Sequence, residues 1–166
     1  MRRARPVLLL LAVSAAAGAE EPRVRHVSAV RPSEAAAWEA RVIDGLRAGT
    51  LALRRADADP FLPGRTHARY AQLLDGIPVE GGELVVQTDG TGAVSVFGSL
   101  LEGLAAPPAP RLSADHALDV VARATGTDLG PGVSPRLLVL PLPGGGRATW
   151  AVRAFTGDDL VLHFVD

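Results

Sequence analysis

Residues 67–98 read HARYAQLLDGIPVEGGELVVQTDGTGAVSVFG, and the expected architecture follows from this pattern. Asp75-Gly76 and Asp89-Gly90 interrupt two apolar runs. Asp-Gly between strand-like segments is a strong hairpin signal, because glycine accepts the positive φ that tight turns need. Around both turns the side chains alternate with a period of two, as from Glu83 to Thr88, which is typical of strands. The stretch therefore predicts three consecutive antiparallel strands.

The same stretch resembles the fungalysin/thermolysin propeptide motif, which opens the pro-region of secreted zinc metallopeptidases. The resemblance lies in the order and spacing of a histidine, Arg-Tyr and a glutamine. Gly-Ile-Pro-Val and two glycines follow, and then an Asp-Gly turn and a closing Val-x-x-x-Gly. The residues that carry the motif, and that the resemblance makes candidates for contact with a peptidase, are His67, Arg69, Tyr70, Gln72, Gly76, Pro78, Val79 and Gly81.

Residues 20–104 are expected to form one propeptide-like unit. Its first segment, residues 20–32, is polar and contains two prolines, which predicts irregular structure. A helix follows, with Ser33 as its N-cap and Gly49 as its end. A short strand then covers residues 50–54, and Asp57 to Gly64 reads as a loop before the three strands.

A second unit is expected at residues 113–166, after a Pro/Ala linker at residues 105–112. Ser113 caps a helix that Gly126 ends. Three β runs follow at residues 136–142, 147–155 and 160–165, and their turns lie at the glycines 144–146 and at residues 157–159. This plan resembles a PepSY-type segment. The predicted fold class is α+β: two small units, each a helix packed on an antiparallel sheet, with all strands antiparallel.

The first nineteen residues have the layout of a secretory signal peptide. Three arginines precede an apolar core at residues 7–13, and Ala17-Gly18-Ala19 gives a cleavage site between Ala19 and Glu20. The apolar run is too short to span a bilayer. The mature protein is therefore expected to be secreted or periplasmic, without a membrane anchor.

Composition excludes several functional classes. The 166 residues contain no cysteine, which excludes disulfides, thiolate metal sites and a cysteine nucleophile. The formal net charge is −1, with no basic cluster outside the N-terminus, so nucleic acid is not expected as a partner.

No catalytic or metal-binding residue is predicted. The four histidines, at positions 26, 67, 116 and 163, lie outside any HExxH pattern, and none is spaced as a ligand pair. His67 is interpreted as a residue that forms hydrogen bonds in or beside the sheet, with metal ligation as the alternative. Asp57 and Asp59, like Asp158 and Asp159, are interpreted as turn residues in preference to calcium ligands.

The resemblance implies a pro-region that assists folding of a thermolysin-like peptidase domain and blocks its cleft, in cis or in trans. Zinc, and any calcium, would belong to that domain alone. Because the sequence stops at Asp166 in the middle of the family pattern, we expect a chain cut short before the peptidase. The alternatives are a stand-alone secreted or periplasmic inhibitor or binding module that acts in trans on a protease, and a cell-envelope scaffold.

Overall fold

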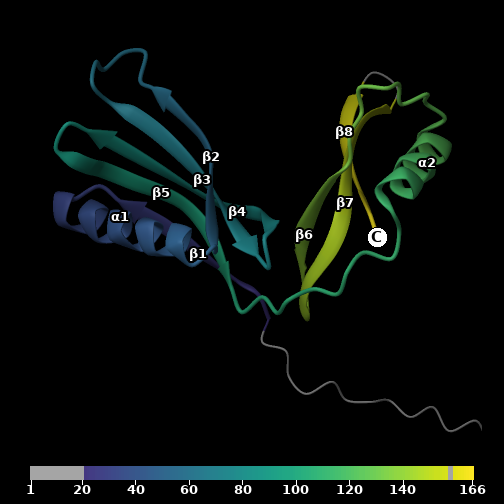
Figure 1. Cartoon of the computed structure of the whole chain (residues 1–166), viewed down its shortest axis with the longest axis horizontal. Coiled ribbons are helices and arrows are strands. Elements are labelled where there is room, and N and C mark those ends of the chain that lie inside the picture. The colour runs from purple at the N-terminus through teal and green to yellow at the C-terminus, as the bar shows by residue number, and fades with distance from the viewer. Residues whose placement is uncertain (1–20, 157–158) are drawn as a thin grey trace, which may run out of the picture.

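A computed structural model describes residues 21–156 and 159–166 (Figure 1). The predicted signal peptide, its cleavage site and most of the turn at residues 157–159 lie outside these residues. Two helices and eight strands follow one another in the order β1 (Arg23–Ala29), α1 (Pro32–Arg47), β2 (Leu51–Ala58), β3 (Thr66–Leu74), β4 (Ile77–Asp89), β5 (Gly92–Glu102), α2 (Ala114–Thr125), β6 (Arg136–Leu142), β7 (Gly145–Thr156) and β8 (Asp159–Val165).

The fold is α+β, as predicted, with a mostly antiparallel sheet of eight strands. Strands β1, β5, β4, β3 and β2 are neighbours in that order, and β6, β7 and β8 form a meander. The prediction that all strands are antiparallel is wrong at one place, because β4 and β6 pair in parallel at Val79 and Val139. The pairing through β4 links the two halves, and the division into two units stays a prediction.

Strand β4 serves both halves of the sheet. From Glu83 to Asp89 it pairs with β5, whereas Val79 pairs with β6. Between these two parts Gly81 has a φ of +79°, a conformation that glycine adopts without steric cost. The strand therefore changes partner at the glycine pair that the sequence pattern singled out.

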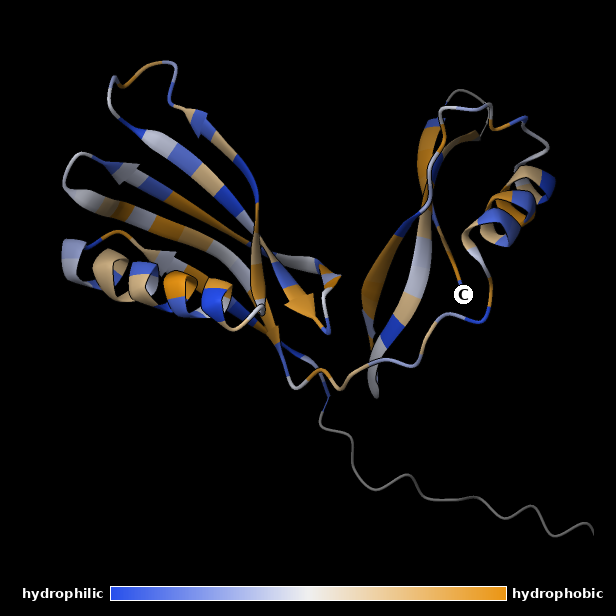
Figure 2. Ribbon diagram, in the orientation of Figure 1, coloured by the Kyte–Doolittle hydropathy of each residue, from blue (hydrophilic) through white to orange (hydrophobic). Residues whose placement is uncertain are grey.

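Apolar side chains gather in three cores. The largest lies under α1, where Trp38 and Tyr70 pack against buried residues that include Val42, Leu84 and Val96. A second lies under α2 and contains Ala117, Val121, Val152 and Ala154. The third joins the two halves and contains Val79, Leu101 and Val139. Figure 2 shows hydrophobic and hydrophilic residues alternating along α1 and along the strands.

The two helices begin in different ways. Ser113 caps α2 as predicted, and its hydroxyl accepts a hydrogen bond from His116 N at 3.2 Å; Gly126, with a φ of +67°, ends that helix. For α1 the predicted N-cap Ser33 is wrong, because this helix starts at Pro32 with Arg31 as an N-cap that makes no side-chain cap bond, whereas Gly49, with a φ of +70°, follows its C-cap as expected. Proline suits the first helical position, since its fixed φ matches the helix and its missing N–H is not needed there.

One strand of the first half was not predicted, and another extends beyond its predicted limits. Residues 23–29, expected to be irregular, form β1 and pair with β5 from Glu102 to Val96. Asp57, expected in a loop, lies in β2 opposite His67. Both segments are exposed along most of their length, so their apolar alternation is weak and pairing with a neighbouring strand decides their structure.

Candidate functional site

The β3–β4 hairpin holds the residues that the sequence pattern pointed to. Its turn is formed by Asp75, with a φ of +50°, and Gly76, with a φ of +78°. Positive φ at both central residues is characteristic of a type I′ turn, which matches the twist of the flanking strands. The predicted turn is therefore confirmed.

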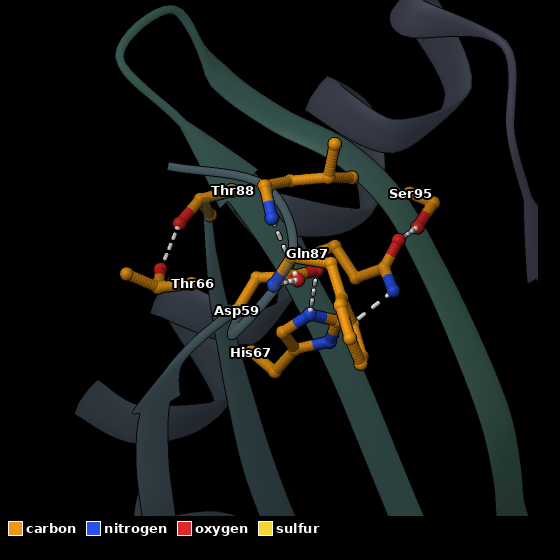
Figure 3. A network of polar contacts seen from close by, with 8 residues as sticks. Asp59, Thr66, His67, Gln87, Thr88 and Ser95 are labelled. Carbon is orange, nitrogen blue, oxygen red and sulfur yellow. Dashed lines mark hydrogen bonds and ion pairs between the residues drawn. The ribbon is translucent and has the colours of Figure 1, made fainter. Parts of the chain in front are cut away.

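His67 lies in a polar network on β3 (Figure 3). Its Nε2 is 2.7 Å from Asp59 Oδ2, and its Nδ1 is 3.2 Å from Gln87 Nε2. Since the Gln87 amide donates to Nδ1, the ring is the Nε2–H tautomer and donates to Asp59. Ser95 Oγ donates to Gln87 Oε1 at 2.6 Å and does not reach the imidazole. Both ring nitrogens are thus occupied by structural partners, and no hydroxyl of this network is activated as a nucleophile.

Asp59 ties the loop between β2 and β3 to this network. Its Oδ1 accepts hydrogen bonds from Phe61 N at 2.8 Å and Leu62 N at 3.0 Å, and its side chain is only 10% exposed. The pKa of the Asp59 carboxyl is lowered, chiefly by the hydrogen bond from His67 and then by the one from Phe61 N. The sequence pattern predicts a turn at Asp59 but does not connect this residue with His67, because that contact depends on the strand pairing.

Acid should weaken the fold through this pair. The folded-state pKa of Asp59 lies below that of the unfolded chain, about 3.9, so the stabilisation is present above that pH and is lost as pH falls through the folded-state pKa. The Asp59→Asn variant should therefore lose less thermal stability than the parent between pH 7 and strong acid. Thermal unfolding followed by circular dichroism across this range measures the difference, and parallel curves for the two proteins would contradict it.

Arg69 and Tyr70 point to opposite faces of β3. Arg69 Nη1 forms an ion pair with Glu83 Oε1 at 2.7 Å on the exposed face. Tyr70 packs against the core under α1, and burial raises the pKa of its phenol. An exposed ion pair contributes little stability, whereas the ring of Tyr70 helps to fill the core.

The side chain of Gln72 bonds β5 just beyond the point where the pairing of β4 with β5 ends. Its Nε2 donates to Leu101 O at 2.7 Å, and its Oε1 accepts from Leu101 N at 2.8 Å, so one side chain replaces a backbone pairing. A Cβ atom at Gly82 would lie 2.6 Å from Gln72 Oε1 and 2.7 Å from Gln72 Cβ. Glycine at position 82 therefore leaves the space that this side chain occupies.

The remaining motif residues lie where the hairpin meets the second half of the sheet. Pro78 pairs with Leu73 across the hairpin, and Val79 is buried and pairs with Val139 of β6. The structure thus brings the eight motif residues onto β3, β4 and the turn between them. Their contact with a peptidase stays a prediction.

Metal-binding groups are not found in the part of the chain that the structure describes: no three residues among histidine, aspartate and glutamate converge there. His26 Nδ1 instead lies 3.1 Å from Ser99 Oγ, and Asp57 forms an ion pair with Arg55. In the same residues, neither helix has the length and apolar character needed to cross a bilayer.

Residues 49–100 match the family model of the Fungalysin/Thermolysin Propeptide Motif. The motif covers β2, β3, β4 and most of β5, and the hairpin and networks described above lie within it. It supports a pro-region of a thermolysin-like peptidase, a class of secreted enzymes, and it is consistent with a non-catalytic pro-part that associates with the peptidase domain. No curated protein matches the chain. The PepSY resemblance of residues 113–166 stays a prediction.

Proposed function

We propose that this protein is the pro-region of a thermolysin-like metallopeptidase, and that it acts as a folding assistant and inhibitor of the peptidase domain. The observation that carries the proposal is the propeptide motif at residues 49–100. The hydrogen bonds in the motif support the proposal, because His67 and Gln72 hold neighbouring segments of the sheet together. A surface that is already ordered loses little conformational entropy when it binds a partner.

Binding accounts for both activities. A folded pro-region that binds only the native peptidase stabilises it by mass action, and a pro-region that covers the cleft excludes substrate. The peptidase domain would belong either to the same precursor, which gives binding in cis, or to a separate chain, which gives binding in trans. Any zinc would belong to the peptidase domain.

Inhibition and assisted refolding are the expected results when residues 20–166 are mixed with the thermolysin-like peptidase domain of the same precursor or the nearest one in the genome. Peptidase activity should fall in a saturable manner, and the yield of active peptidase after dilution from denaturant should rise. Heat-unfolded pro-region is the matched control and should do neither. If tens of micromolar native pro-region changes neither quantity, the proposed function is wrong.

We also propose export through residues 1–19. The basic start, the apolar core and the Ala17-Gly18-Ala19 site support it. N-terminal sequencing of the protein recovered outside the cytoplasm should begin at Glu20. Recovery of a cytoplasmic protein that retains Met1 would contradict this proposal.

A further inference from the structure

Strands β6, β7 and β8 have one face that no helix covers. Helix α2 packs against Trp150, Val152 and Ala154, which alternate along β7 and lie on one side of it. In Figure 1, α2 lies on the side of these strands away from β2–β5, so the open face is turned toward that part of the molecule. The strand register places Leu138, Thr149 and Ala151 on the same face, where they are buried, and the open part of the face carries these side chains: Arg136, Arg153, Phe155, Leu160, Leu162 and Phe164.

This open face exposes several large apolar side chains. Phe155 is 56% exposed, Leu160 is 55% exposed and Phe164 is 40% exposed. A groove of about 630 Å³ runs over the face, and its other wall is the loop of residues 127–134. Contiguous exposed apolar surface of this kind is typical of interaction sites.

Two cations lie among these apolar side chains. Arg136 and Arg153 both line the groove, and neither forms an ion pair with an acidic side chain of the described residues. Asp128, the acidic residue of the groove, accepts a hydrogen bond from Gly130 N, and Arg147 on the same face is paired with Asp166 at 3.1 Å. Among the lining residues two arginines stand against the single carboxylate of Asp128, so the groove has a net positive charge, which favours an occupant with carboxylates beside apolar side chains.

The charge also argues against a second copy of this chain as the occupant. A two-fold symmetric dimer brings the same patch of both subunits together, so the arginines of one copy would meet those of the other. Like charges brought together in an interface are costly. A partner with a different, acidic and apolar surface fits better.

We propose that the open face of β6–β8 is the docking surface for the peptidase domain, which contributes an apolar segment flanked by carboxylates. The inference rests on the proposed function, because the propeptide motif is what implies a peptidase partner. It adds the location of the contact: the motif on β2–β5 builds the first half of the sheet, and the second half supplies the apolar surface that binds.

The test compares two pairs of substitutions at exposed apolar residues. Phe155→Ser with Leu160→Ser should weaken inhibition of the peptidase domain at least 30-fold, whereas Leu53→Ser with Phe61→Ser, at positions 53% and 88% exposed in the first half, should change it less than about two-fold. Because all four side chains are exposed, thermal midpoints should stay near that of the parent. Arg153→Glu should weaken binding about tenfold at low salt and less at high salt. This charge reversal leaves the apolar residues in place and gives the answer if the first pair fails to fold.

Each other outcome overturns the inference. Equal losses in both pairs, or a loss in the control pair alone, would place the contact elsewhere while the proposed function stands. Absence of inhibition by the parent chain would remove the proposed function and this surface with it. A parent chain that sediments as a dimer, and becomes monomeric on Phe155→Ser with Leu160→Ser, would identify a second copy as the occupant.

Discussion

Gly98→Ala is expected to prevent folding of the first half of the sheet. Gly98 lies in β5 between Val27 of β1 and Leu84 of β4, with a φ of +142° that side chains rarely adopt. An added Cβ atom would lie 2.1 Å from the carbonyl oxygen of Glu83 and 3.0 Å from Leu84 Cα. These are backbone atoms of a paired strand, so they cannot rotate away, and relief requires that β4 and β5 separate.

The expected loss is at least about 4 kcal/mol, which is comparable with the whole stability of a small domain. Urea unfolding followed by circular dichroism measures it, or shows directly that the variant is unfolded. Gly90→Ala is the matched control: nothing lies within 4 Å of an added Cβ at that turn position, so the change should stay within about 1 kcal/mol. A Gly98→Ala protein with near-parental stability would show that β4 and β5 lie farther apart than described.

Gln72→Ala is expected to have the second largest effect. The substitution removes the side chain that donates to Leu101 O and accepts from Leu101 N. Leu101 lies beyond the part of β5 that pairs with β4, so β4 cannot replace these bonds. A buried backbone group without a partner costs about 1–3 kcal/mol, so two of them predict a loss of about 2–6 kcal/mol. Water that enters the gap would bring the loss toward the lower value.

Gln87→Ala provides the control for this prediction, because Gln87 is also a glutamine and lies in β4, next to the strand β3 that carries Gln72. Within the described residues, the side chain of Gln87 bonds the side chains of His67 and Ser95 and no backbone group, so the loss should be about 1 kcal/mol. Urea unfolding of both variants gives the comparison. Equal losses would mean that the Leu101 backbone finds another partner, and that Gln72 does not hold the point where β4 changes strands.

Local signals in the sequence were sufficient for the hairpin and for the second half. Asp75-Gly76 specifies its turn through positive φ, and Ser113 and Gly126 mark both ends of α2. Such features depend on a few neighbouring residues, and the α+β class follows from the order of the elements.

Features that depend on distant residues were not predicted. Strand β1 buries only Val27 and Ala29, so its pattern is indistinct until β5 lies beside it. The parallel pairing of Val79 with Val139 joins segments that neither hairpin nor turn brings together. Within the candidate site, His67 was expected to form hydrogen bonds, but Asp59 and Gln87 could not be named as its partners. Those contacts require the register of β2, β3 and β4.

Strand β1 has a consequence for a chain that emerges from the ribosome one residue at a time. Of the described strands it is synthesised first, yet its only strand partner among them is β5, which ends at Glu102. Until β5 has been synthesised, β1 has no strand to pair with. After that, the edge of β5 stays exposed until β1 pairs with it. Exposed edges of this kind recruit strands from other chains. Synthesis at high local concentration should therefore favour aggregation of nascent chains through these two edges, before any partner protein is met.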